Sequence, residues 1–170
     1  MSEKRVTLAQ VAALAGVSPT AVSLVLNDKP GSRLSADAAH RIRAAAAQLD
    51  YRPNPAARSL RVGKTQTVAF LSDDVTVTRY ASAMIRGLLD VAEKHQHTVL
   101  IAETGSNPRR VKEALRAMLD RQPDAIVFGL MGAKEIDVPR IPADLPVVLI
   151  NSTSPKNHPS VLPAEFEAGR

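Results

Sequence analysis

The chain of 170 residues contains no cysteine and no tryptophan, and aromatic residues make up only 3% of it. Without cysteine there is no disulfide framework, no thiolate nucleophile and no cysteine-ligated zinc or iron–sulfur site. So few aromatic rings also disfavour an RNA-binding surface that stacks bases on aromatic side chains. The core must therefore be built from aliphatic side chains and alanine.

Long apolar stretches are absent as well. The longest runs, residues 125–130 and 147–150, are far shorter than the roughly 20 residues that span a bilayer. The first ten residues, MSEKRVTLAQ, lack the apolar segment of a signal peptide. We therefore expect a cytoplasmic protein with no membrane partner.

Signatures of enzymes and cofactor sites are missing too. The four histidines, His40, His95, His97 and His158, show no HExxH pattern and no metal-ligand spacing. There is no G-x-G-x-x-G fingerprint, no Walker loop and no G-x-S-x-G elbow. We expect no catalytic residues, no metal and no cofactor.

The net positive charge lies in the first third of the chain. Apolar residues make up 45% and charged residues 23% of the chain, as in ordinary globular proteins. Residues 1–64 contain ten Lys/Arg against four Asp/Glu, whereas residues 65–170 contain twelve against thirteen. This asymmetry indicates a polyanion-binding module joined to a neutral one, although a solvated basic face would give the same count.

Local signals in the first third predict three short helices. Thr7 and Gln10 can form a capping box before an apolar stripe over residues 8–15, and Gly16 ends that helix. Ser18 and Pro19 form the N-cap and first position of a second helix that runs to about residue 27. Ser35 caps a third helix.

The second helix has two distinct faces. At about 100° per residue, Val22, Val25 and Leu26 point inward. The outward face carries Thr20, Ser23, Leu24 and Asn27. It is polar, nearly uncharged and includes a leucine, which suits base edges and thymine methyl groups in a major groove. An exposed leucine without a role remains the alternative.

A hinge is predicted after the third helix. Two prolines within residues 51–55 end the bundle. Residues 56–61 favour a helix but are too few to hold one in isolation, and residues 62–64 form a linker. A marginal basic helix of this kind is expected to fold on contact with DNA.

From residue 67 onward strands and helices alternate. Apolar runs at residues 67–71, 98–102, 125–130 and 146–150 predict four strands. Amphipathic stripes predict one helix over residues 81–92 and another that begins at Asn107–Pro108. Continuous apolar strands between such helices are typical of a parallel sheet covered on both faces.

Two segments, VTLAQVAALAGVSPTAVSLVLN and RLSADAAHRIRAAAAQLDYRPNPAARSL, closely resemble the headpiece of the LacI/GalR (lactose-repressor-like) family of bacterial transcription regulators. The part from residue 67 on is similar to the start of that family's periplasmic-binding-protein-like core. The resemblance implies an all-α helix-turn-helix headpiece at 1–52, a hinge helix and linker at 53–64, and a partial α/β effector and dimerisation domain at 65–170. Only the N-terminal subdomain of the core would be present.

The resemblance further implies a repressor that binds a palindromic operator as a homodimer under the control of a sugar-like effector. The family's base-reading positions fall on Pro19, Thr20 and Leu24, and its hinge positions on Asn54, Ala57 and Leu60, with Leu60 as a minor-groove wedge. The full set expected to contact DNA is Thr7, Leu8, Ser18, Pro19, Thr20, Ser23, Leu24, Asn27, Tyr51, Asn54, Ala57, Arg58 and Leu60.

Effector contacts are expected where the strands end, at Asp74, Thr78, Tyr80, Leu130 and Asn151. Asp73 and Asp74 follow the first strand, where they could cap the next helix or bind a polyol; a catalytic carboxylate pair is the weaker alternative.

Three features depart from the family's pattern. Leu24 stands where arginine is common and cannot make a bidentate guanine contact, and Arg79 replaces a proline in the effector loop. The chain also stops at Arg170, before the second subdomain, so we expect weak dimerisation and no effector response.

Two other functions remain open: a sugar-binding α/β protein whose basic start is incidental, and an inactive or dominant-negative truncated regulator. The salt dependence of binding to random duplex DNA separates a regulator from a sugar binder.

Overall fold

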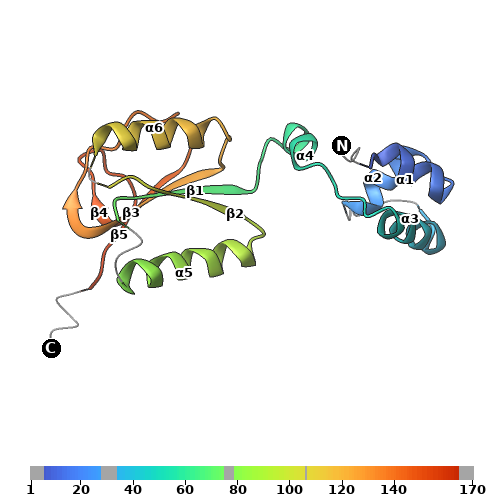
Figure 1. Ribbon diagram of the computed structural model, residues 1–170, viewed down its shortest axis with the longest axis horizontal. Helices are drawn as coiled ribbons and strands as arrows, with labels where there is room; N and C mark the ends of the chain where they lie inside the picture. Colours follow the sequence, from blue (N-terminus) through green and yellow to red (C-terminus); the bar gives the residue numbers. More distant parts are fainter. Residues whose placement is uncertain (1–5, 28–33, 75–78, 106, 165–170) are drawn as a thin grey trace, which may run out of the picture. The chain divides into compact units, whose positions relative to one another are not determined.

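The computed structural model describes residues 6–27, 34–74, 79–105 and 107–164. The chain divides into two compact units, residues 1–58 and residues 59–170 (Figure 1). We call the first the helical unit and the second the α/β unit. The prediction of helices followed by a parallel α/β sheet is confirmed.

Three helices form the helical unit: α1 (Leu8–Ala15), α2 (Pro19–Leu26) and α3 (Ala36–Gln48). Each begins where its cap was predicted. Thr7 and Gln10 form the capping box of α1, and the Ser18 and Ser35 side chains accept hydrogen bonds from the first turns of α2 and α3. Gly16 ends α1 in the left-handed region at φ 66°, a conformation that glycine adopts without strain.

Each helix of the helical unit contributes one completely buried aliphatic side chain to the core. Val11, Val22 and Ile42 are completely buried. Small residues surround them, and Leu8, Leu26, Leu49 and Tyr51 pack at the rim. The alanine-rich core expected from the composition is therefore present, and it lets three short helices approach closely.

The α/β unit follows α4 (Pro55–Val62), which crosses the boundary between the units. Its sheet contains β1 (Thr67–Ser72), β2 (Thr98–Glu103), β3 (Ala125–Glu135), β4 (Val147–Thr153) and β5 (Ser160–Val161). All pairs are parallel, in the order β2-β1-β3-β4-β5. Two helices, α5 (Arg79–Lys94) and α6 (Pro108–Leu119), lie on opposite faces of this sheet (Figure 1).

The two faces of the sheet are packed differently. On the α6 face, Leu115 and Met118 belong to one buried cluster with the alternate strand residues. On the other face, the ring of Phe70 lies so close to Gly129 that a Cβ at position 129 would come within 2.5 Å of it. Glycine is therefore required at this point of β3.

Two strand predictions need correction. β3 continues through residues 131–135, beyond the predicted end at residue 130, because Lys134 and Glu135 pair with Ser152 and Thr153 of β4 beyond an irregularity in register. β5 was not predicted, since two residues carry no periodic signal.

Among the described residues, no single helix is long and apolar enough to cross a membrane; α1 and α2 meet that test only as a pair bent by 102°.

Candidate nucleic-acid interface and sheet edge

The outward face of α2 is polar and accessible. Thr20 is exposed, and Ser23, Leu24 and Asn27 are half-buried, whereas Val22 and Val25 are buried on the opposite side. The Asn27 side-chain amide donates a 2.6 Å hydrogen bond to the Ser23 carbonyl. Asn27 therefore also fixes the end of the helix.

The other predicted DNA-contacting residues of the helical unit have different local settings. Thr7 and Ser18 cap α1 and α2, so the exposed N-termini of both helices carry a hydroxyl. Leu8 and Tyr51 pack against the core, and Pro19 is exposed. Helix N-termini of this kind bind phosphate through their free N–H groups.

Helix α4 is a formed helix in the structure, although it has only eight residues. Its start is held by the Asn54 side chain, which accepts a 3.1 Å hydrogen bond from the Ala56 N–H. Ala57 and Arg58 are exposed, and Leu60 is 89% exposed. With so little burial, α4 gains almost no stability from packing. That the helix folds only on contact with DNA therefore stays a prediction.

A half-buried carboxylate, paired with an exposed lysine, stands at the carboxyl edge of the sheet. The Asp73 carboxylate accepts hydrogen bonds from the Met131 N–H at 3.0 Å and from Lys134 Nζ at 2.8 Å. Asp73 is 13% exposed and Lys134 46%. Burial alone would raise the pKa of Asp73, but the hydrogen bonds from Lys134 and Met131 and the charge of Lys134 outweigh it and lower the pKa below 3.8.

This pair lines a hollow of about 560 Å³ on the α6 side of the sheet. The polar and charged groups that line it are Ser72, Asp73, Thr104, Arg109, Lys112, Lys134 and Asp137. The sequence prediction missed Lys134 and Arg109, because Lys134 reaches Asp73 only through the unpredicted extension of β3. In the sequence, a lysine four residues after the predicted end of a strand gives no sign that it pairs with Asp73.

The predicted effector residues are only partly gathered here. Leu130 lines the hollow, and the buried Asn151 donates a 2.9 Å hydrogen bond to the Leu130 carbonyl. Tyr80 is exposed on α5, which covers the opposite face of the sheet, and Asp74 is half-buried. Thr78 lies outside the described residues.

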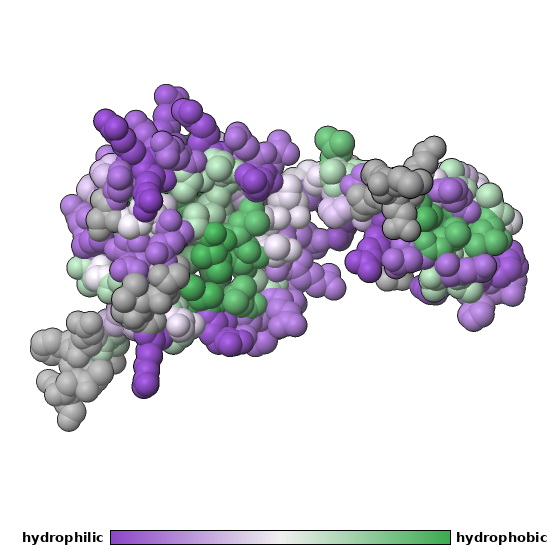
Figure 2. Space-filling view, viewed as in Figure 1, coloured by the Kyte–Doolittle hydropathy of each residue, from purple (hydrophilic) through white to green (hydrophobic). Residues whose placement is uncertain are grey.

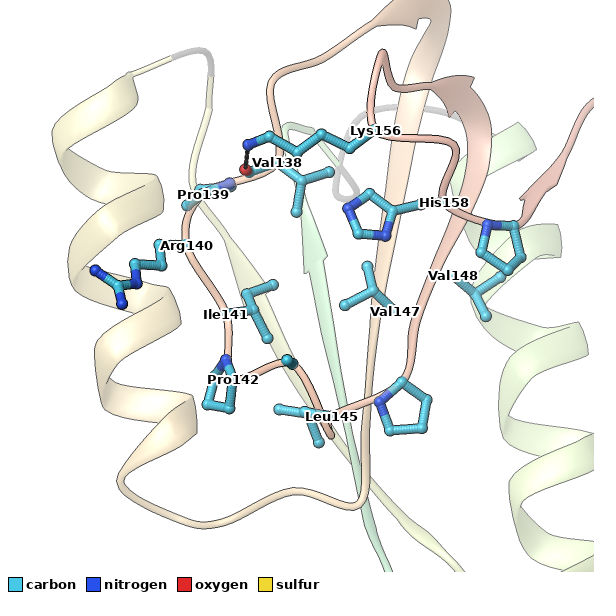
Figure 3. A pocket seen from close by; sticks show the side chains of 13 residues that line it. Val138, Pro139, Arg140, Ile141, Pro142, Leu145, Val147, Val148, Lys156 and His158 are labelled. Atoms are coloured by element: carbon cyan, nitrogen blue, oxygen red, sulfur yellow. Dashed lines mark hydrogen bonds between the residues drawn. The ribbon is translucent and has the colours of Figure 1, made fainter.

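A second hollow, of about 750 Å³, lies beside the connection between β3 and β4. In Figure 3 Ile141, Leu145 and Val147 point into it, whereas Arg140 points away. Lys156 is engaged with Asp137 and with the Val138 carbonyl. Its apolar lining offers less to orient a polyol than the hollow beside Asp73 does.

No group of three or more histidine or acidic side chains that could hold a metal ion exists in the described part of the chain.

The Asp73 pair makes a pH-dependent contribution to stability. Because the folded pKa lies below the unfolded one, the contribution is present above about pH 4 and is lost as the pH falls through the folded value. At pH 7 we expect Asp73→Asn to lower the free energy of unfolding by about 1 kcal/mol or more, and the difference from the wild type to shrink at pH 3. Urea unfolding at several pH values measures this.

Asp137→Asn is the matched control. Asp137 pairs with Lys156 at 2.8 Å, but its side chain is 83% exposed. We expect a change within about 0.5 kcal/mol at every pH. Equal effects of the two variants would contradict a special role for Asp73.

The comparisons with known proteins agree with this architecture. Residues 7–54 match the family described as "Bacterial regulatory proteins, lacI family". The chain is 32% identical over 152 residues to the HTH-type transcriptional regulator PtxS of Pseudomonas aeruginosa. This match covers 88% of this chain and 44% of that protein. It is 33% identical over 123 residues to catabolite control protein A of Staphylococcus aureus, covering 72% of this chain and 36% of that protein.

A solved structure shares the fold. The lac repressor dimer bound to operator and the anti-inducer ONPF superimposes with a TM-score of 0.78 at 22% identity, over 96% of this chain and 50% of that one. The chain thus spans about half the length of that repressor, and less than half of the two curated relatives.

The capped helical unit and the parallel sheet give the chain a helix-turn-helix unit followed by an α/β unit. The chain belongs to the lacI family. The relatives named above are regulators rather than enzymes.

Proposed function

We propose that the chain is a sequence-specific DNA-binding transcriptional regulator, acting as a repressor on a palindromic operator. The outward face of α2 carries this proposal. It presents hydroxyls, an amide and one leucine, with no charged side chain among Thr20, Ser23, Leu24 and Asn27. Small hydrogen-bonding groups next to an apolar one match the donor, acceptor and methyl pattern of base edges in the major groove.

Phosphate and minor-groove contacts complete the proposed interface. The capped N-termini of α1 and α2 bind backbone phosphates, which positions α2 in the groove. Helix α4 offers Leu60 to the minor groove, where an inserted apolar side chain opens a base step. The basic excess of the first 64 residues supplies the salt-dependent part of the affinity.

A homodimer is part of the proposal. Apolar side chains gather over β2 and the neighbouring part of α5 (Figure 2). Ile101 of β2 is 43% exposed. Leu89 and Val91 of α5, 39% and 54% exposed, lie about 200° apart around the helix, so only one of them can border β2. We assign this surface, at the edge of the sheet, to contact with a second copy of the chain.

We assign effector binding to the hollow beside Asp73 in the α/β unit. Its carboxylate, hydroxyl and cationic groups suit a polar molecule of the sugar type, and parallel sheets bind ligands at this edge.

The proposal is tested by selecting DNA sequences that bind the full chain and by measuring the affinity for the selected operator and for random duplex at several salt concentrations. We expect a palindromic consensus, tight binding to it, and weak binding to random duplex that falls steeply with salt. Absence of affinity for either DNA would refute the regulator and favour a sugar-binding protein.

Leu24→Arg is expected to change which operator is selected. Leucine contacts a thymine methyl group or a pyrimidine edge, whereas arginine binds the two acceptors of guanine. The variant should gain a preference for guanine at one position in each half-site, worth about 1–3 kcal/mol. Selection with both proteins measures this, and an unchanged operator would show that Leu24 does not face the bases.

Ile101→Lys is expected to weaken dimerisation. A lysine within the apolar surface of β2 and α5 carries a charge that has to be desolvated on association, so the dimer dissociation constant should rise about tenfold or more. Sedimentation equilibrium measures it. Leu162→Lys is the control, because Leu162 is 50% exposed just after β5, at the other end of the sheet order. Equal effects of the two lysines would place the dimer contact elsewhere.

A further inference from the structure

The linker between α4 and β1 is bound to the sheet by one carboxylate. Asp124 lies directly before β3. One of its oxygens, Oδ1, accepts a 2.9 Å hydrogen bond from the Thr65 N–H, and Oδ2 accepts a 2.8 Å bond from the Gln66 N–H. The Asp124 side chain is only 17% exposed. Two consecutive backbone donors of the linker thus converge on a residue nearly 60 positions further along the chain.

Further hydrogen bonds attach the end of the linker, Thr65 and Gln66, to the sheet. The Asp124 N–H donates to the Thr67 carbonyl at 2.7 Å, and the Thr98 N–H to the Gln66 carbonyl at 2.8 Å. The Thr65 hydroxyl donates to the Gln122 carbonyl at 2.8 Å. Gln66 has a φ of 54°, which is uncommon for a residue with a side chain and persists only where the surroundings hold it.

The hinge helix itself is not packed on this edge. A hollow of about 580 Å³ separates the second half of α4, with Ser59 and Leu60, from Pro123, Asp124 and Leu145. Gly63 and Lys64 are the two residues between the end of α4 and Thr65. The position of α4 relative to the sheet is therefore governed by the short segment up to the Asp124 carboxylate.

We propose that Asp124 is a positioning residue for operator binding. Its carboxylate confines the freely rotating linker to Gly63 and Lys64, so that α4 is presented at a set distance from the sheet. In a dimer, this sets the separation of the two α4 helices before they reach DNA. Without the carboxylate, the Thr65 and Gln66 amides lose their acceptor, and these two residues keep the Thr65 hydroxyl bond to Gln122 and the Gln66 carbonyl bond to Thr98. The free segment then extends beyond Gly63 and Lys64, and ordering it on binding costs conformational entropy. The inference rests on the proposed function, because it concerns binding to the operator.

Asp124→Asn tests the inference. The amide keeps the shape of the side chain but replaces one acceptor oxygen with a donor, so it cannot accept from both linker amides. In the full chain without DNA, we expect faster hydrogen exchange at the Thr65 or Gln66 amide. Affinity for the selected operator should fall about tenfold or more, the range for losing a hydrogen bond to a charged group, whereas affinity for random duplex changes less than about twofold.

Two controls isolate the linker. Asp144→Asn removes a charge at the same hollow from an exposed side chain, and His97→Gln removes the histidine that lies 3.8 Å from Asp124 Oδ2. Neither should change the ratio of operator to random-duplex affinity. If Asp124→Asn lowers both affinities equally, or leaves the operator affinity unchanged once the amide protection is lost, Asp124 does not position α4.

A second variant covers the case in which Asp124→Asn does not fold. Two glycines inserted after Gly63 lengthen the free segment and leave the Asp124 hydrogen bonds in place. We expect the same selective loss of operator affinity, and full operator affinity would overturn the inference. Failure of the wild-type chain to bind any DNA would instead refute the proposed function.

Discussion

Leu60→Ala is expected to weaken binding to the operator by about 2 kcal/mol or more per half-site and to leave binding to random duplex nearly unchanged. The leucine side chain is 89% exposed on α4, so it loses no packing within the free protein when it is truncated. On the operator it would be buried between base pairs, which recovers about 1.5–3 kcal/mol of apolar burial against the cost of unstacking. Side-by-side titration of operator and random duplex at one salt concentration measures the contrast.

Val62→Ala serves as the matched control on the same helix. Val62 is 54% exposed, and it lies two residues, or about 200° of helical rotation, away from Leu60. If Leu60 is a wedge, Leu60→Ala lowers the affinity for the operator but not for random duplex, whereas Val62→Ala changes neither selectively. An equal drop on operator and random duplex after Leu60→Ala would mean that α4 contacts phosphates alone.

Ile42→Ala is expected to remove most of the stability of the helical unit. Ile42 is completely buried in the cluster that joins the three helices, and truncation of such a side chain costs about 2–5 kcal/mol. At about 0.05–0.15 kcal/mol per residue, a unit of 58 residues has only about 3–9 kcal/mol to lose. Its thermal transition, followed by circular dichroism, should fall by roughly 10 °C or more.

The effect of Ile42→Ala on DNA binding differs in kind from that of Leu60→Ala. Unfolding the helical unit removes the α2 face and the capped helix ends together, so affinity for operator and for random duplex should both decline. Ile42→Val is the control: it keeps the branched shape and costs about 0.5–1.5 kcal/mol. If Ile42→Ala unfolds at the same temperature as the wild type, the core tolerates the cavity.

The helix starts and the strands could be predicted because their signals are local. A hydroxyl at Thr7, Ser18 or Ser35 satisfies an N–H group three residues further on, and that need is visible in any sequence window of four residues. Apolar runs located four of the five strands for the same reason. The outward polar face of α2 followed from helical geometry alone.

Other features depend on residues far apart in the chain. The Asp73–Lys134 pair joins positions 61 residues apart, and the bond from the Thr65 N–H to Asp124 joins positions 59 residues apart. Neither pairing has a periodic signature, because each depends on which strands become neighbours in the sheet. The sequence accordingly predicts Asp74 as an effector residue, whereas Asp73 lines the hollow.

The sequence by itself determined the class of this protein: its basic first third, its capped helices and its alternating strands are properties of short windows and of composition. Tertiary structure alone decided how those elements are coupled. Sheet order brought β3 beside both β1 and β4, which placed Asp124 against the linker and Lys134 against Asp73. The physical reason is that hydrogen bonds to these half-buried carboxylates require donors at particular points in space, and those points exist only once the sheet has formed.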